Sequence, residues 1–341
     1  MSRNLTRLAP LVVLVVLALL PFSTLQVPGL FDGVLNSPGT LQLIALCLVF
    51  GGVALSYDLL FGFTGLLSFG HALYFAAGTY VANLALTEMG LGLGAALALT
   101  TVVGIVLPLV VGGVALRVSG IAFSMVTLAT AQVGSIIVLQ DPGGLTGGEE
   151  GLAVARDPIP DVFIGVFNTV NKYWLALAYL ALVYVVVTLL TSSRAGRVWE
   201  AIRENERRVE VLGLKPYPFK LLVFVLAGLL ASLGGVVHLL LLGGSTPRVT
   251  TSDFTLSLLV MVVLGGVLYT YLDSRLTDLA QSPAVQDLPA WLRVPLSEPL
   301  FLLGTLFVLI VFFVPGGVAS LGRRVRRVRE ALRARPAEVV S

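Results

Sequence analysis

The segment from Phe61 to Leu84 concentrates small and polar residues within an otherwise apolar run. It reads FGFTGLLSFGHALYFAAGTYVANL, with glycines recurring among hydroxyl side chains and one histidine. Small residues let membrane helices or half-helices approach closely, and polar groups at membrane depth line a cavity or meet buried partners. The pattern therefore fits a path for a small solute, and it fits equally a tightly packed helix pair whose hydroxyls bond internally. The candidate path residues, one of them from a later run, are Gly62, Gly65, Ser68, Gly70, His71 and Thr127.

A second pattern, from Arg194 to Lys220, combines an apolar stripe with paired charges. It reads RAGRVWEAIRENERRVEVLGLKPYPFK, and opposite charges recur at helical spacing, as in Glu204 and Arg208. Gly213 is expected to end this helix, because two prolines follow it closely. The residues predicted to share the apolar stripe are Val198, Ala201, Ile202, Val209 and Leu212.

A solvated loop needs neither an apolar stripe nor a defined stop, so we expect this short helix to dock into a groove on a soluble partner. The residues we expect to carry that contact are Glu200, Ala201, Arg203, Glu204 and Gly213.

Several chemistries lack a motif in this chain. No G-x-x-x-x-G-K-[ST] phosphate loop occurs, so any ATP that drives the protein is hydrolysed on another chain. No Ser/His/Asp or Cys/His arrangement has supporting context, which disfavours an enzyme. Cys47 is the one cysteine, and His238 has no second ligand nearby, so neither a disulfide, a metal site nor a bound cofactor is expected.

The elements that must position these residues are membrane helices. The chain has 57% hydrophobic and 12% charged residues, too little polar surface to wrap a water-soluble protein of 341 residues. Lipid is therefore the expected solvent, and the chain is expected to be an all-α polytopic membrane protein. The first predicted spans lie near 8–27, 40–60, 62–87, 91–115, 119–139 and 172–191.

The positive charges indicate an orientation. Seven lysines and arginines lie in Arg194–Lys220, seven in Arg323–Arg335 and two at Arg3 and Arg7, so the basic segments are expected on the cytoplasmic side. This clustering also makes nucleic-acid binding an unnecessary inference. The segment 141–171 carries five carboxylates against one arginine and is expected to form an ordered external loop. Within it, Thr146, Gly147 and Gly148 are the candidate docking surface for an external partner.

The second half of the chain gives three candidate spans, near 219–243, 255–272 and 298–320. An odd number would place the basic tail 321–341 outside, against the charge rule. Either the tract around Gly265 and Gly266 is re-entrant, or a crossing is missing from this region.

Four segments in order resemble the permease subunits of branched-chain amino acid ABC importers, the M-type more than the H-type. They read GFTGLLSFGHALYFAAGTY, SGIAFSMVTLATA, LTGGEEGL, and GRVWEAIRENERRVEVLG followed by LLVMVVLGG. The resemblance implies one permease domain over 1–341, built from two inverted repeats (1–140 and 172–320) with about 8–10 membrane helices. It also implies that the loop 192–220 contains the coupling helix for the ATPase.

The resemblance further implies the partners: an H-type second permease, two ABC ATPase subunits that bind the ATP, and an extracytoplasmic substrate-binding protein. The location would be a prokaryotic plasma membrane, with both termini cytoplasmic. The chain departs from the family after Gly266, where VLYTYLD replaces a glycine-rich stretch, which supports the hypothesis of a missing crossing.

Three other functions remain open at this point. Related permeases carry urea, short amides or other amino acids, and no side chain here separates these substrates. An ion-coupled secondary transporter would usually carry charged residues in mid-membrane, and the apolar tracts are almost free of them. A membrane scaffold without transport is the third alternative.

Overall fold

The computed structural model describes residues 13–25, 34–165 and 168–264. Met1–Leu258 forms one compact unit and Leu259–Ser341 a second. The expected span 298–320, the basic tail and the sequence after Gly266 lie outside the described residues. The elements in chain order are an apolar helix at Val13–Phe22 that ends in η1 (Leu20–Phe22), α2 (Pro38–Asp58), the π-helical η2 (Leu59–Phe63), α3 (His71–Thr87), α4 (Leu93–Ala115), α5 (Ile121–Gln140), η3 (Pro142–Gly144), β1 (Leu152–Ala153), η4 (Asp161–Phe163), α6 (Thr169–Ser192), α7 (Arg194–Val211), α8 (Pro216–Leu242), β2 (Gly244–Ser245), η5 (Pro247–Thr250) and α9 (Ser252–Leu264).

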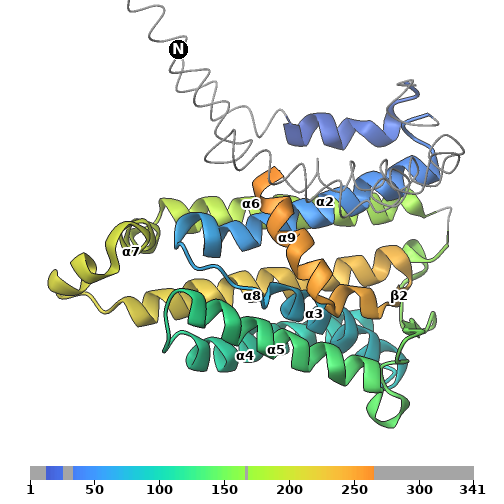
Figure 1. The fold of residues 1–341 in the computed structure, drawn as a ribbon. Coiled ribbons are helices and arrows are strands. Elements are labelled where there is room, and N and C mark those ends of the chain that lie inside the picture. The colour runs from blue at the N-terminus through green and yellow to red at the C-terminus, as the bar shows by residue number, and fades with distance from the viewer. Residues whose placement is uncertain (1–12, 26–33, 166–167, 265–341) are drawn as a thin grey trace, which may run out of the picture. The chain divides into compact units, whose positions relative to one another are not determined.

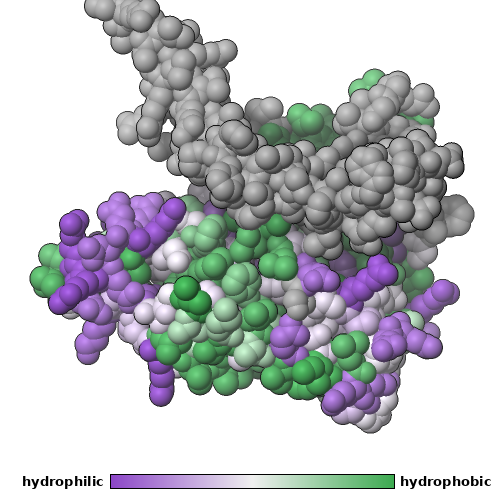
Figure 2. Space-filling model, viewed as in Figure 1, coloured by the Kyte–Doolittle hydropathy of each residue, from purple (hydrophilic) through white to green (hydrophobic). Residues whose placement is uncertain are grey.

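The expectation of an all-α membrane protein is confirmed. Among the described residues, five helices are long and apolar enough to cross a bilayer. On the face drawn in Figure 2, hydrophilic residues gather at the α7 end and at the opposite end, with mostly hydrophobic surface between them. These five spans match the predicted ones within a few residues, and they are Pro38–Phe63, Leu93–Ala115, Ile121–Gln140, Thr169–Ser192 and Pro216–Leu242.

Local sequence explains where these helices begin and end. The Ser37 hydroxyl accepts a hydrogen bond from the Thr40 N–H at 3.4 Å, and Pro38 follows at the first helical position of α2. Gly243 takes a left-handed conformation, with φ of 74°, directly after α8. The ends of α2 and α8 are thus both set by their own flanking residues.

The helices run up and down between two ends of the first unit (Figure 1). At one end lies α7, and there the Tyr217 hydroxyl donates to the Gly113 carbonyl of α4 at 2.9 Å. At the other end β1 pairs antiparallel with β2, joining Leu152 to Ser245. Each end therefore brings together residues that lie far apart in the sequence.

Helix α8 is the centre of the first unit, because α2, α3, α4, α6 and α7 all pack against it. Two glycines permit the closest approach, between α3 and α8. A Cβ on Gly78 would lie 2.0 Å from the Ser232 carbonyl oxygen, and one on Gly235 would lie 2.2 Å from the Phe75 carbonyl oxygen. The two backbones are therefore in direct contact, as small-residue packing in membranes requires.

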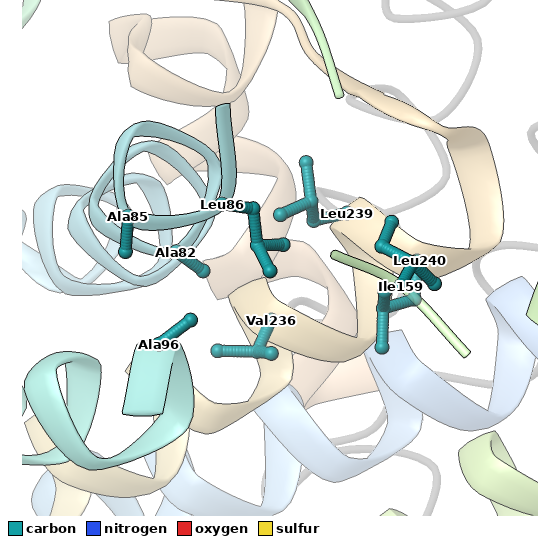
Figure 3. Close-up of a cluster of buried hydrophobic side chains, with 8 residues drawn as sticks. All are labelled: Ala82, Ala85, Leu86, Ala96, Ile159, Val236, Leu239 and Leu240. Atoms are coloured by element: carbon teal, nitrogen blue, oxygen red, sulfur yellow. The ribbon is translucent and has the colours of Figure 1, made fainter. Parts of the chain in front are cut away.

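A buried apolar cluster ties the β1–β2 end together (Figure 3). Side chains from α3, α4 and α8 converge there, and Ile159 enters it from the segment between β1 and η4. The segment 141–171, expected as an ordered loop, is thus anchored by an apolar contact as well as by strand pairing. The cluster residues are Ala82, Ala85, Leu86, Ala96, Ile159, Val236, Leu239 and Leu240.

One predicted span is wrong in its extent. The expected helix 62–87 begins only at His71, and its 17 residues rise about 26 Å, short of the roughly 30 Å of a hydrocarbon core. The first part of the range is instead the end of η2 followed by non-helical backbone from Thr64 to Gly70. The apolar character of the segment gave its depth in the membrane, but not its backbone conformation.

Candidate functional site

The backbone between α2 and α3 is broken inside the protein. The helix first widens into the π-helical turn η2 and then loses helical geometry, with Gly65 at φ of 74°. A Cβ on Gly62 would lie 1.9 Å from Asp58 Oδ1, so the carboxylate of Asp58 occupies the space that a side chain would need. Gly65 thus has a backbone conformation that favours glycine, and Gly62 leaves space for the Asp58 carboxylate. We call Thr64–Gly70 the broken segment.

Hydroxyl side chains replace the helical hydrogen bonds of the broken segment. The Tyr57 hydroxyl donates to the Ser68 carbonyl at 2.7 Å, and the Ser124 hydroxyl donates to the Leu67 carbonyl at 2.6 Å. The Phe69 N–H donates to Thr127 Oγ1 at 3.1 Å. Non-helical backbone at membrane depth survives only where protein or a cavity satisfies it, and here α2 and α5 do so.

His71, the first residue of α3, is completely buried beside the broken segment. The Ser56 hydroxyl donates to the Val53 carbonyl at 2.7 Å, so the contact of 2.9 Å between Ser56 Oγ and His71 Nε2 requires the imidazole to donate. Nδ1 is then an acceptor. Both His71 Nδ1 and the Tyr74 hydroxyl are buried without a hydrogen-bond partner among the described residues. These atoms keep bonding capacity that water or a polar solute can use.

Helix α7 consists of two halves. The Ser193 hydroxyl caps the first half by accepting from the Gly196 N–H at 3.2 Å. Asn205 leaves the helical conformation, with φ of −163° and ψ of 99°, and its side-chain oxygen caps the second half by accepting from the Arg208 N–H at 3.0 Å. Gly213, at φ of 86°, then ends the helix as expected.

The first half of α7 is fastened to the membrane bundle. Trp199 is fully buried and its Nε1 donates to the Phe219 carbonyl at 2.9 Å. Glu206, just past the break, pairs with the buried Lys220 of α8. The Arg203 guanidinium donates to the Gly62 carbonyl of η2. These three contacts hold α7 against both α8 and the start of the broken segment.

The apolar stripe predicted for α7 is partly wrong. Ile202 and Val209 are buried against the chain itself, together with Trp199, which sequence analysis had not placed in the stripe. Ala201 is exposed, and Leu212 is 74% exposed. The buried stripe therefore binds α7 to its own bundle, and the surface left for a partner is a different one.

At the β1–β2 end, Asp141 organises the loop that follows α5. It lies in the left-handed region, at φ of 47°, and its Oδ1 accepts from the Thr146 N–H at 2.6 Å and from the Gly147 N–H at 3.1 Å. The Thr146 N–H, with the Thr146 hydroxyl and the Gly147 N–H, holds the pKa of this carboxyl below its ordinary value. Thr146 and Gly148 are buried and Gly147 is half-buried, and the exposed residues that follow them are Glu149 and Glu150.

The structure brings the candidate path residues together, whereas the coupling candidates lie on and just after α7 and the docking candidates lie in the loop after α5. The broken segment contains or adjoins five of them: Gly62, Gly65, Ser68, Gly70 and His71. The sixth, Thr127, contacts the segment from α5, where a Cβ on Gly70 would lie 3.0 Å from the Thr127 carbonyl oxygen. Sequence analysis missed Tyr57 and Ser124 as partners. Ser124 lies three residues before Thr127, a spacing that places two hydroxyls on one helical face and could have revealed the site. The described residues contain no cluster of three metal-ligating side chains.

The fold and site define a multi-pass all-α membrane protein with a polar break among its spans and an amphipathic helix at one end. The family model for "Branched-chain amino acid transport system / permease component" matches residues 39–277, well over half of the chain. The chain belongs to this family of transport permeases.

Individual relatives agree with the family match. The chain is 25% identical over 311 residues to the high-affinity branched-chain amino acid transport system permease protein LivM of Escherichia coli K12, covering 84% of this chain and 71% of that one. It is 23% identical over 338 residues to a probable LivM permease of Methanocaldococcus jannaschii, covering 82% of this chain and 94% of that protein. No solved structure matches.

Family membership makes the chain a permease component of a transport system that has other subunits.

Proposed function

We propose that this chain is the M-type membrane subunit of an ATP-driven importer, and that it carries branched-chain amino acids by alternating access across a prokaryotic plasma membrane. The observation that carries the proposal is the direct contact between α7 and η2, which joins a helix outside the apolar bundle to the broken segment inside it. The names of its relatives supply the substrate class. An H-type permease, two ATPase subunits and an external binding protein complete the importer, and ATP binds to the ATPases.

The docking surface for an ATPase follows from what α7 leaves exposed. The first half exposes Glu200, Ala201 and Glu204, which lie within one turn of each other. At the end of the second half, Val211 is 82% exposed and Leu212 is 74% exposed. An apolar tip beside a charged turn suits a groove with an apolar floor and a polar rim. The basic residues of Arg194–Lys220 favour a cytoplasmic position for α7 and for both chain termini.

The α2–α3 break supplies the movable part of the path. The hydroxyl bonds that fix it come from side chains, which can exchange partners without unfolding a helix. His71 Nδ1 and the Tyr74 hydroxyl are the buried groups with bonding capacity to spare. A weak polar contact with the solute is enough, because the external binding protein supplies affinity.

The test is uptake of labelled leucine by the purified complex in liposomes. We expect uptake that requires ATP on the α7 side and that valine and isoleucine inhibit, with copurification of the ATPases and the second permease. Uptake driven by an ion gradient without ATP would contradict the proposal and favour a secondary transporter. Inhibition by urea or amides alone would contradict the substrate class.

A further inference from the structure

Arg203 points from α7 toward the membrane bundle rather than toward a partner. Its guanidinium donates to the Gly62 carbonyl, and its aliphatic stem lies against Gly65, where a Cβ would be 3.2 Å from Arg203 Cγ. Gly65 is in the left-handed region as well, so a side chain at this position would meet both strain and the arginine stem. Gly65 therefore makes room for the arginine stem, whereas the space beside Gly62 is taken by the Asp58 carboxylate.

The Gly62 carbonyl needs a partner from another element. The last carbonyls of a helix have no following turn to supply an N–H group. In this turn the Leu59 carbonyl accepts from the Thr64 hydroxyl at 2.9 Å, and the Leu60 carbonyl accepts from the Leu66 N–H at 2.8 Å. The Gly62 carbonyl accepts from Arg203, with the Asp58 carboxylate beside it. A hydrogen bond from a charged donor is about twice as strong as a neutral one.

The bond from Arg203 lies at the Gly62 end of the break, and three candidate path residues, Ser68, Gly70 and His71, lie toward the other end. Beyond Gly65 the backbone is held to α5 through Ser124 and Thr127, and it then enters α3 at His71. A displacement of α7 that moves Gly62 therefore acts along the broken segment toward His71. Without this bond, a displacement of α7 would leave the segment held by α2 and α5 through Tyr57, Ser124 and Thr127.

We propose that Arg203 is a positioning residue that conveys the movement of α7 to the broken segment. The proposal rests on the proposed function, because it assigns the step between the ATPase contact and the path. Arg203 is not needed to keep α7 in place, since Trp199 and the Glu206–Lys220 ion pair fasten α7 to α8 independently. Removal of the Arg203 side chain should disconnect α7 from the broken segment while α7 stays packed against α8.

The first experiment replaces Arg203 in the whole complex. Arg203→Ala is expected to assemble and to hydrolyse ATP, while uptake per ATP hydrolysed falls about tenfold, the scale of one charge-assisted hydrogen bond. Arg203→Lys, which keeps a charged donor, is expected to retain part of the uptake per ATP hydrolysed. The matched control is Arg197→Ala, which removes an exposed arginine from the same half of α7. Equal losses in Arg203→Ala and Arg197→Ala, or none in Arg203→Ala, would overturn the proposal.

The second experiment replaces the bond with a covalent one. A Cβ on Gly65 would lie 3.7 Å from Arg203 Cβ, within the range of about 3.5–4.5 Å that a disulfide needs. The experiment uses a Cys47→Ala background with the pair Gly65→Cys and Arg203→Cys. This variant is expected to show low uptake per ATP hydrolysed when reduced and to regain uptake when oxidised. The single variants should not respond to oxidation. A cross-linked pair that stays uncoupled shows that the contact does not carry the movement.

A third measurement separates this inference from the proposed function. In the purified full-length chain, Arg203→Ala is expected to raise hydrogen exchange at the Leu66 amide, which bonds to Leu60, and to leave the amides of α8 near Lys220 unchanged. This readout needs neither substrate nor ATP. If the wild-type complex imports no amino acid, the proposed function fails while the exchange result still tests the link. Unchanged exchange at Leu66 would reject the link itself.

Discussion

At the scale of single residues, the described part of the chain shows how a membrane interior tolerates polar backbone. Tyr57, Ser124 and Thr127, whose hydroxyls bond the broken segment from outside, lie on the helices beside it, and the glycines lie where another group already occupies the space of a side chain. Residue types in this region therefore follow from close contacts more than from helix propensity. Adding a methyl group at a glycine that contacts another helix should therefore lower the stability of the fold, whereas adding one at a lipid-facing glycine should not.

Gly78 and Gly94 form a matched pair for this expectation. Gly78→Ala would place a Cβ 2.0 Å from the Ser232 carbonyl oxygen, so α3 and α8 must separate, and the expected loss of stability is about 1–3 kcal/mol. Gly94, in α4, has nothing within 4 Å of such a Cβ, and Gly94→Ala should be neutral or stabilising by about 0.5–1 kcal/mol. Thermal unfolding in detergent compares the two. A Gly78→Ala variant as stable as wild type would show that the helices do not touch there.

Asp141 gives an expectation for pH. Its carboxyl has a pKa below its ordinary value of 3.8, because the Thr146 N–H and its neighbours bond the ionised form. A depressed native pKa contributes stability that is present above the ordinary value and is lost as pH falls through the native one. The protection of the Thr146 and Gly147 amides, compared with the exchange of an unstructured chain at the same pH, should therefore fall only below about pH 4. Asp141→Ala should show the faster exchange at neutral pH, and Asp141→Asn should be intermediate because it keeps an acceptor.

At the scale of elements, helix ends were easier to predict than the course of the backbone within an apolar run. The stop at Gly213 was predicted from a glycine followed by prolines, and the structure confirms it. The range 62–87 was predicted as one helix, because hydrophobicity reports depth and not whether the backbone bonds to itself. The bonds from Tyr57, Ser124 and Thr127 that stabilise the break depend on tertiary contacts across α2 and α5.

The α7 stripe shows a second limit of the sequence. Its residues were assigned by helical spacing over the whole segment, but Asn205 interrupts the helix and resets the register after it. Asparagine is favoured at a helix cap and is tolerated in a helix interior, so Asn205 by itself is only a weak signal of the break. The exposed position of Leu212 follows from that break, whereas Ala201 lies before the break, beside the buried face that Trp199 and Ile202 form. The roles of the candidate path, coupling and docking residues stay predictions.

Asn205 itself is open to test. Asn205→Ala removes the side-chain oxygen that accepts from the Arg208 N–H, and loss of such a cap costs about 1 kcal/mol. We expect faster hydrogen exchange at the amides of Glu206–Val211 and little change in the first half of α7. Asn205→Asp, which keeps a capping oxygen, is the control. Equal exchange in Asn205→Ala and wild type would mean that the ion pair to Lys220 alone orders the second half.

At the scale of the whole molecule, the first unit has two chemically distinct ends. At one end, α7 meets η2 through Arg203, and α8 meets the end of α4 through Tyr217. At the other, Asn83 of α3 donates to the Leu152 carbonyl at 2.7 Å and to the Ser245 hydroxyl at 2.9 Å, joining α3 to both strands. Basic residues concentrate near the first end and acidic ones in the loop at the second. Charge and contacts therefore agree on which segments share a side of the membrane.

This arrangement predicts which positions an impermeant thiol reagent reaches. In a Cys47→Ala background, which removes the one native thiol, Glu149→Cys should react in intact cells and Ala201→Cys only in inside-out vesicles, because both residues are exposed at opposite ends. Gly113→Cys is an unsuitable probe, since its neighbour Tyr217 covers it. Glu150→Cys repeats the first position, and Glu204→Cys repeats the second on α7. Reaction of both ends from the same side would contradict the up-and-down path of the helices. If instead Ala201→Cys reacts in intact cells and Glu149→Cys only in inside-out vesicles, the path stands and the orientation inferred from the basic residues is reversed.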